Sequence, residues 1–258
     1  SGVAGLVMRS HVVIWGSNTG VGKTLVSAGL ISAARRRACA ALYLKPAQTG
    51  FPTDADGRFV ARLSDRLVEH LPDAGRAVEF YGPHARDAAQ IGGRAPPEIP
   101  TKAGEVAPLV CETLFAWNTA VGPHLAVKHE GRPVSDDMLV SATLEVLARE
   151  HRLAIVETFG GVASPAPSRS LQCDALLPLQ LPALLVGDGA LGGISSTLCA
   201  GEALSRRGIP LVGVVLIDGG LENQDALGEH LHPVPVTVLP PFAKASDGGE
   251  VGEGPIAD

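Results

Sequence analysis

The sequence is short of three things that would point to particular classes of partner. Aromatic residues make up only 4% of its 258 residues, and Asp and Glu outnumber Lys and Arg by 27 to 21, which gives a formal net charge of −6. No block of basic residues offers phosphate contacts, so the composition argues against a nucleic-acid partner. No apolar run approaches the roughly 20 residues of a membrane-spanning helix, so no membrane partner is expected.

Cysteine is also scarce, and its spacing carries no metal or disulfide signature. The four cysteines form no Cys-x-x-Cys pair; they are Cys39, Cys111, Cys173 and Cys199. We therefore expect reduced thiols in an intracellular compartment.

Both ends of the chain lack the patterns of folded structure. Residues 1–10 have neither the basic nor the apolar region of a signal peptide, and we expect a tag remnant or a flexible N-terminus there. Residues 243–258 are rich in glycine and acidic residues, which is typical of a linker-like tail. Residues 11–242 are the predicted single domain, within which the Pro- and Gly-rich residues 71–108 are expected to form a long surface excursion.

Six short apolar runs alternate with stretches of helical periodicity along this domain. The runs cover residues 11–15, 41–44, 153–156, 183–186, 211–217 and 234–239, and the helical patterns cover residues 24–37, 57–70, 135–150, 194–207 and 222–230. The alternation predicts an α/β fold in which a parallel sheet has helices on both faces. Ligands of such sheets bind at the carboxyl ends of the strands, so the residues that follow each run are the candidates for chemistry.

The loop after the first apolar run is close to a phosphate-binding P-loop. Gly-Lys-Thr stands at residues 22–24, but the earlier glycine of the motif is Gly16, one place further back than the standard spacing. Backbone N–H groups of residues 20–22 would bind a phosphate at the N-terminus of a helix. Lys23 would reach the β- and γ-phosphates, and the Thr24 hydroxyl would bind Mg²⁺. The alternative is a glycine turn that only starts a helix.

Polar residues follow two other apolar runs. Lys45 comes directly after residues 41–44, where it would stand beside the phosphate loop or, alternatively, face solvent as most strand-end lysines do. Asp54 and Asp56 come soon after, and they could equally form a turn or a helix cap. Glu157 ends a later run and precedes two glycines, a placement that suits a second Mg²⁺ ligand in nucleotide enzymes.

Glycine and serine residues also follow the run at residues 183–186. Gly192 and Gly193 precede Ile194 and Ser195 at the expected start of a helix. Such a start would make a second anion-binding helix N-terminus. An ordinary helix cap is the alternative.

Taken together, these segments resemble the dethiobiotin synthetase family. In chain order they are Gly16-Ser-Asn-Thr19-Gly-Val-Gly-Lys-Thr24, Lys45-Pro-Ala-Gln-Thr49-Gly50, Gly122-Pro-His-Leu125 with Glu130-Gly-Arg-Pro133, Glu157-Thr-Phe-Gly-Gly161 and Leu191-Gly-Gly-Ile194. The resemblance runs from about Val12 to Pro241, and the extra loop residue is a trait of the family. Phe115-Ala-Trp-Asn118 is similar to the plant-type enzyme, in which this domain precedes a diaminopelargonate aminotransferase.

The resemblance implies a P-loop domain that works as a homodimer with shared active sites. The implied reaction converts 7,8-diaminopelargonate, CO₂ or bicarbonate, and ATP to dethiobiotin, ADP and phosphate in biotin biosynthesis, with Mg²⁺ as the cofactor. It proceeds through a carbamate and a carbamic-phosphoric anhydride. The plant type implies a location in the mitochondrial matrix and a possible fused C-terminal aminotransferase domain; without it, a cytoplasmic location is expected.

The resemblance also assigns roles to individual residues. The implied catalytic residues are Thr19, Lys23 and Lys45. The implied ATP-binding residues are Asn18, Thr19, Gly20, Val21, Gly22, Lys23, Thr24, Leu25, Asp218, Pro240 and Pro241. The implied Mg²⁺ ligands are Thr24, Asp56 and Glu157. The implied substrate-binding residues are Thr19, Lys45, Thr49, Gly160, Gly192, Gly193, Ile194 and Ser195.

The chain departs from the family at the nucleotide base. Ile217 precedes Asp218 where bacterial members place Asn-Asp, and isoleucine cannot form the paired hydrogen bonds of an amide. Base selectivity therefore stays open. Two other classes are kept as alternatives: an ATPase switch of the ParA/MinD type, which carries a signature lysine where this loop has Asn18, and a non-catalytic nucleotide-binding scaffold.

Overall fold

The computed structural model describes residues 10–68, 78–81 and 109–241. The expected N-terminal segment, apart from Ser10, and the expected tail at residues 243–258 lie outside the described residues. Those two assignments therefore stay predictions.

Eight strands form one sheet in which every neighbouring pair is parallel. The order across the sheet is β3-β4-β2-β5-β1-β6-β7-β8. The strands are β1 (Ser10–Gly16), β2 (Ala41–Gln48), β3 (Val78–Tyr81), β4 (Leu109–Ala116), β5 (Leu153–Glu157), β6 (Ala183–Val186), β7 (Leu211–Ile217) and β8 (Val236–Leu239). This arrangement confirms the predicted α/β class with a P-loop-type parallel sheet.

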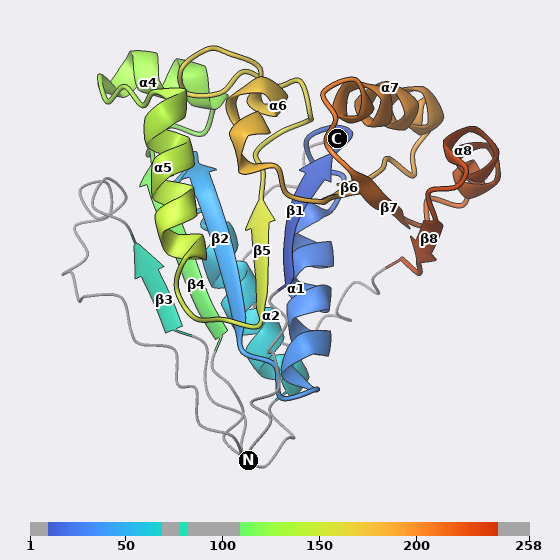
Figure 1. Ribbon diagram of the computed structural model, residues 1–258, viewed down its shortest axis with the longest axis horizontal. Helices are drawn as coiled ribbons and strands as arrows, with labels where there is room; N and C mark the ends of the chain where they lie inside the picture. The colour runs from blue at the N-terminus through green and yellow to red at the C-terminus, as the bar shows by residue number, and fades with distance from the viewer. Residues whose placement is uncertain (1–9, 69–77, 82–108, 242–258) are drawn as a thin grey trace, which may run out of the picture.

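Helices cover both faces of the sheet, as Figure 1 shows. The helices are α1 (Lys23–Arg35), α2 (Asp56–Val68), α4 (Pro123–Glu130), α5 (Asp136–Leu147), α6 (Gln172–Ala175), α7 (Gly193–Ser205) and α8 (Asn223–Leu231), with a short 3₁₀ turn at Leu177–Leu179. α1 and α2 pack on one face, and α5, α6 and α7 pack on the other. α8 packs beside α7 at the β8 edge.

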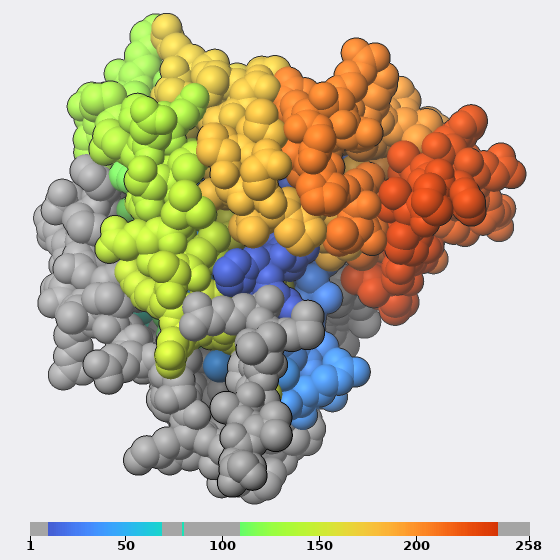
Figure 2. All heavy atoms as spheres, in the orientation of Figure 1, coloured from blue at the N-terminus to red at the C-terminus, as the bar shows by residue number. Residues whose placement is uncertain are grey.

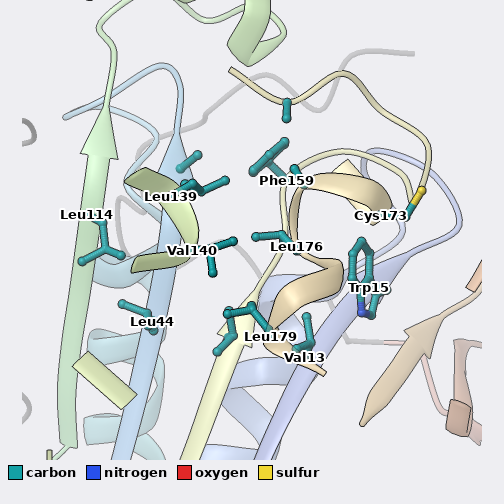
Figure 3. Close-up of a cluster of buried hydrophobic side chains, with 14 of the residues drawn as sticks. Val13, Trp15, Leu44, Leu114, Leu139, Val140, Phe159, Cys173, Leu176 and Leu179 are labelled. Atoms are coloured by element: carbon teal, nitrogen blue, oxygen red, sulfur yellow. The ribbon is translucent and has the colours of Figure 1, made fainter. Parts of the chain in front are cut away.

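The sheet is buried on both faces, because parallel strands with crossover helices leave neither face to water. All eight residues of β2 and all eight of β4 are buried. Figure 3 shows the larger core, in which Val13 of β1 and Leu44 of β2 lie in one cluster with Leu139 of α5 and with Leu176, the residue after α6. The smaller core lies under α1 and α2. Both cores hold the strands in place, so the carboxyl ends of β1, β2 and β5 are fixed relative to one another.

Two strands are missing from the pattern of apolar runs. β4 carries Glu112 and Thr113 in its middle, both buried, and Arg149 Nη1 lies 2.7 Å from Glu112 Oε2. Polar residues at buried positions interrupt an apolar run, so the strand went unrecognised. β3 lies inside residues 71–108, and the expectation of a surface excursion is wrong for residues 78–81. The rest of that segment lies outside the described residues.

Other boundaries differ in informative ways. β2 extends to Gln48, so Lys45 lies within the strand and not after it. Lys45 and Gln48 interrupt its apolar pattern because both contact residues of the candidate site, whereas Ala47 between them packs in the larger core. α4 and α6 were not expected, whereas the ends of the five expected helices differ from the predicted ends by one to three residues. All four cysteines are free thiols. Across the described parts of the chain, no helix combines the length and apolar character needed to cross a membrane.

Candidate functional site

The loop between β1 and α1 has the backbone of an anion-binding turn. Gly20 and Gly22 have φ values of +77° and +94°, in the left-handed region that favours glycine. Gly22 is also the N-cap of α1, whose first residue is Lys23. The Oδ1 atom of Asn18 accepts a hydrogen bond of 2.8 Å from the Thr19 N–H, which fixes the loop's outer end. The loop therefore presents its N–H groups at a helix N-terminus, where the helix dipole favours an anion.

Lys23 is a buried cation held by backbone oxygens. Its Nζ donates to the carbonyl of Gly160 at 2.8 Å and to that of Asn18 at 3.3 Å. Burial, and then the neighbouring charge of Lys45, lowers the pKa of Lys23 from 10.5 to about 8, although Glu157 and Asp56 offset part of this effect. An ammonium that is short of negative partners is prepared to bind an incoming anion.

Two carboxylates and two hydroxyl groups meet below this loop. Thr24 Oγ1 donates to Glu157 Oε1 at 2.9 Å and lies 3.4 Å from Asp56 Oδ1. Ser27 Oγ donates to the other oxygen, Glu157 Oε2, at 2.8 Å. Glu157 ends β5 and is fully buried, and Asp56 begins α2. The first turn of α1, the end of β5 and the start of α2 thus converge on one point.

Lys45 closes the cluster from β2. Its Nζ lies 2.6 Å from Asp56 Oδ2 and 2.9 Å from Glu157 Oε1, and it also donates to the Thr158 carbonyl at 3.1 Å. Burial alone would lower the pKa of Lys45, but Asp56 and Glu157 outweigh burial and raise that pKa above its usual value. The lysine is buried and paired, so the alternative of a solvent-facing strand-end lysine is wrong.

The oxygen atoms of the cluster fit a magnesium ion. Mg²⁺ prefers hard oxygen ligands and takes only one or two carboxylates when phosphate and water supply the rest. Thr24, Asp56 and Glu157 offer one hydroxyl and two carboxylates, and the Lys45 ammonium already occupies the place of a cation between the two acids. Within the described ranges no group of three or more His, Cys, Asp or Glu side chains could hold a metal ion alone.

The structure also separates the two candidate aspartates. Asp56 joins the cluster, whereas the Asp54 carboxylate lies against the turn at Gly50, 2.5 Å from where a Cβ on that glycine would stand. Gln48 links the two positions, because its amide donates to the Asp54 carbonyl at 2.9 Å and accepts from the Asp56 N–H at 3.3 Å. Asp56 is therefore the candidate ligand.

Several residues of this cluster were not found from the sequence. Ser27 lies three residues after Thr24 on the same side of α1, and helical spacing could have indicated it. Gln48 and Thr158 act on their neighbours through buried polar contacts that no motif marks. Gln172 of α6 is also fully buried and donates to the carbonyls of Phe159 and Gly161, which fixes the turn after β5.

The remaining candidates near the phosphate loop lie around its rim. Thr19 is exposed, and its Oγ1 is 3.7 Å from the Cβ position of Gly160. Gly160 has a φ of +59° and gives its carbonyl to Lys23. Thr49 follows β2 and is half-buried, and Val21 and Leu25 are half-buried beside the start of α1.

The second glycine-rich loop lies between β6 and α7, at the same edge of the sheet. α7 begins at Gly193, with Gly192 as its N-cap at a φ of +87°. Ile194 is half-buried and Ser195 is exposed in its first turn, and the preceding Leu191 is 93% exposed. A Cβ on Gly193 would lie 2.0 Å from the Asp188 carbonyl oxygen. A side chain at this position would therefore strike the loop itself.

The expected base-side residues lie at the ends of β7 and β8. Ile217 Cδ1 would be 2.2 Å from a Cβ on Gly22, so the isoleucine packs directly on the phosphate loop. Asp218 accepts a hydrogen bond from the Gly220 N–H at 2.8 Å and donates its own N–H to the Leu239 carbonyl. Pro240 and Pro241 follow β8 and are exposed. Ile217 therefore makes this side of the site apolar at the position where the resemblance gives bacterial members an amide, and base selectivity stays open.

Comparison with known protein families and curated sequences gives a consistent result. Residues 10–117 and 110–244 match the family described as AAA domain. The chain is 41% identical, over 90% of its length, to the mitochondrial bifunctional dethiobiotin synthetase/7,8-diamino-pelargonic acid aminotransferase of Arabidopsis thaliana, and 42% identical, over 89%, to that of Oryza sativa subsp. japonica. It spans only about a third of those relatives, 31% and 30% of their lengths.

A shorter relative is covered almost completely. The ATP-dependent dethiobiotin synthetase BioD of Anaeromyxobacter dehalogenans is 32% identical, with 88% of each chain covered. Among solved structures, a ParA family ATPase from Chlorobium tepidum matches with a TM-score of 0.54 and 9% identity, over 91% of this chain and 85% of its own. MinD with Mg-ADP from Pyrococcus horikoshii matches at 0.51 and 18%, over 90% and 82%. These two likenesses show the fold alone.

Proposed function

The chain belongs to the dethiobiotin synthetase family, and from that premise we propose that it is an ATP- and Mg²⁺-dependent cyclo-ligase. It converts 7,8-diaminopelargonate, CO₂ and ATP to dethiobiotin, ADP and phosphate in biotin biosynthesis. The observation that carries the proposal is the cluster at the phosphate loop, in which Lys23, Lys45 and Glu157 are buried and Thr24 and Asp56 are half-buried. A scaffold domain without chemistry would have no need to keep three charged groups buried.

The proposed reaction has three steps. One amine of the substrate takes up CO₂ and forms a carbamate. A carbamate oxygen attacks the γ-phosphorus of ATP, and ADP leaves. The second amine then attacks the carbamate carbon, the ureido ring closes and phosphate departs.

The physical difficulty of this reaction is repulsion between anions. A carbamate must approach a triphosphate, so catalysis depends on holding the two in line and on neutralising their charge. Lys23 and Lys45 supply two cations, and Lys23 exchanges its carbonyl partners for phosphate oxygens. Mg²⁺ held by Thr24, Asp56 and Glu157 neutralises the phosphate charge when bound. We assign contact with the carbamate or the amines to Thr19 and Thr49, which lie near the phosphate loop and at the end of β2.

The distant carboxylate of the substrate needs a site of its own. We assign it to the first turn of α7, at Gly192 to Ser195, supplied by the partner subunit of a homodimer, with Gly160 on the near side. The exposed Leu191 beside this turn suits a position in a subunit interface.

A mixed dimer tests this shared site. Ser195→Glu places a negative charge at an exposed position of the turn and should raise the KM for the diamine through like charge. Lys23→Ala should inactivate the phosphate loop. If each site uses the loop of one chain and the helix of the other, a heterodimer of the two variants regains one intact site. No recovery from a proven heterodimer would place loop and helix in the same chain.

The wider setting of the enzyme is also a proposal. Because the plant relatives are bifunctional and mitochondrial, we place the natural protein in the mitochondrial matrix, fused to an aminotransferase domain. An immunoblot of fractionated source tissue tests both points. The chain resembles the ParA/MinD-type switches in fold alone, since Asn18 stands where those proteins carry their signature lysine.

The direct test of activity is mass spectrometry for dethiobiotin. The protein is mixed with diaminopelargonate, bicarbonate, ATP and Mg²⁺, and each component is omitted in turn. Dethiobiotin should form only in the complete mixture, and phosphate release should depend on the diamine. Steady ATP hydrolysis that ignores the diamine would contradict the proposal and favour the switch.

A further inference from the structure

Two loops at the carboxyl edge of the sheet touch through their backbones. The β6–α7 loop covers residues 187–192, and the β7–α8 loop covers residues 218–222. A Cβ on Gly189 would lie 2.3 Å from the Ile217 carbonyl oxygen, and a Cβ on Gly219 would lie 2.2 Å from the Gly189 carbonyl oxygen. Only glycine allows this approach at either position. Their helices α7 and α8 lie side by side on the face seen in Figure 2.

One buried amide joins the two loops. Asn223 is the first residue of α8, and only 7% of it is exposed. Its Nδ2 donates one hydrogen bond to the Asp188 carbonyl at 3.1 Å and the other to the Ala190 carbonyl at 3.0 Å. Both donors of the amide are therefore used by a loop more than thirty residues away in sequence.

The β6–α7 loop is also tied to the helix that it introduces. The Asp188 N–H donates to Thr197 Oγ1 at 3.1 Å, and the Gly193 N–H donates to the Ala190 carbonyl at 2.9 Å. The two carbonyls that Asn223 holds thus belong to the residues that set where α7 begins. Asn223 is therefore hydrogen-bonded to the residues at the N-terminus of α7.

The contacts of these two loops extend to the phosphate loop through Ile217. The side chain of Ile217 packs on Gly22, while its carbonyl oxygen packs on Gly189. A single residue at the end of β7 therefore contacts both the nucleotide side and the β6–α7 loop. Contiguous packing of this kind is the physical means by which two sites can be coupled.

We propose that Asn223 is a positioning residue that ties the α7 N-terminus to the nucleotide side of the site. This inference rests on the proposed function, in which that N-terminus binds the substrate carboxylate. A nucleotide that packs against Ile217 restricts the motion of the β7–α8 loop. Through its hydrogen bonds, Asn223 then restricts the first turn of α7, which binds the diamine's carboxylate. Coupling between two binding events is reciprocal, so the diamine should equally tighten the nucleotide.

Two variants of similar size test the role of the amide. Asn223→Leu removes both donors, and Asn223→Asp turns a carboxylate toward two carbonyl oxygens. With two hydrogen bonds lost, we expect the KM for the diamine at saturating ATP to rise about tenfold in either variant, whereas the KM for ATP measured at a low diamine concentration changes less than about twofold. Gln224→Leu removes the neighbouring amide on α8 and should leave both KM values unchanged.

Hydrogen exchange separates positioning from mere structural support. Adding a non-hydrolysable ATP analogue to the wild-type protein should slow amide exchange in residues 188–195, and Asn223→Leu should lose that protection while still binding the analogue. This measurement needs no turnover, so it decides the inference even if the wild-type protein makes no dethiobiotin and the proposed function fails. Equal protection in wild type and variant, or a melting temperature lowered with unchanged KM values, would overturn it.

Discussion

The two sides of the candidate site are built from different materials. The phosphate side is made of charged side chains, with Lys45 buried against Asp56 and Glu157 and Lys23 buried beside them on backbone carbonyls. The α7–α8 side is made of backbone, with two glycines in contact and one amide bound to two carbonyls. The phosphate side depends on charged side chains, whereas the α7–α8 side depends largely on glycines, which have no Cβ atom.

This difference determines which substitutions should disrupt each side. A buried charge that loses its partner is costly, so the phosphate side is sensitive to the removal of a charge. The backbone side is sensitive instead to an added Cβ, as the 2.0 Å approach at Gly193 shows. The variants below test how far this contrast holds, from the largest expected effect to the smallest.

Loss of the Lys45 charge should have the largest effect. We expect Lys45→Gln to lower turnover by roughly 10²-fold or more, because the attacking carbamate and the transferred phosphoryl group lose a cation. The variant should also melt earlier without ligand, since Asp56 and Glu157 then face each other without it. Mg²⁺ with ATP should restore much of the melting temperature, as calorimetry can show.

The exposed Lys128 of α4 supplies the control, and Lys128→Gln should match the wild-type protein in turnover and melting temperature. Normal turnover in Lys45→Gln would show that this lysine only supports the two carboxylates structurally.

Loss of a magnesium ligand should come next. We expect Glu157→Gln to weaken Mg²⁺ dependence and activity by at least about tenfold, and Thr24→Val to act similarly, because each removes an oxygen ligand or its charge. The measurement is turnover as a function of Mg²⁺ concentration.

Glu112 is a matched control, since it is another buried glutamate in the same sheet and pairs with Arg149. Glu112→Gln should lower stability while leaving the Mg²⁺ titration unchanged. If turnover of both Glu157→Gln and Thr24→Val depended on Mg²⁺ concentration as in the wild-type protein, the assignment of the metal site would be wrong.

The apolar base side should give a smaller effect. Ile217 offers no hydrogen bond to a nucleobase, so we expect similar kcat/KM values for ATP and CTP. Ile217→Asn adds an amide there and should change that ratio by about fivefold. Val212→Asn, at an exposed position of the same strand, should leave the ratio as it is. A wild-type protein that already discriminates strongly would place base recognition on other residues.

The smallest expected effect is the uptake of a proton by Lys23 when the nucleotide binds. Burial and Lys45 lower the pKa of Lys23 to about 8, so near pH 8 the free protein holds this lysine about half protonated. A triphosphate favours the charged form and raises the pKa again, so binding at pH 8 should take up about half a proton and weaken as the pH rises further. Calorimetry in two buffers of different ionisation enthalpy measures the uptake.

Lys23→Arg stays charged throughout this range and should bind without proton uptake. Proton release on binding to the wild-type protein would contradict the assignment of the shifted group to Lys23.

The same contrast explains how much could be predicted from the sequence. Apolar runs predicted six of the eight described strands, and motif position indicated Lys23, Thr24, Lys45 and Glu157, because charged groups beside glycines are visible as residue types. Asp56 was singled out from Asp54 only by the family resemblance. β4 was missed because two buried polar residues, Glu112 and Thr113, interrupt its apolar run, and the Arg149 that pairs with Glu112 lies far away in sequence. Asn223 was missed because its role depends on which backbone oxygens lie opposite, and no residue pattern encodes that.

The charge balance of the phosphate side has a kinetic consequence. Lys23 and Lys45 cancel Asp56 and Glu157, and the chain as a whole is negative. Such a site projects little attractive field into solution, and electrostatic steering needs a net field. Nucleotide should therefore arrive at an unsteered rate that changes little with ionic strength, or rises slightly as salt screens the overall repulsion. Selectivity for the triphosphate should then come from its dissociation rate and not from its association rate.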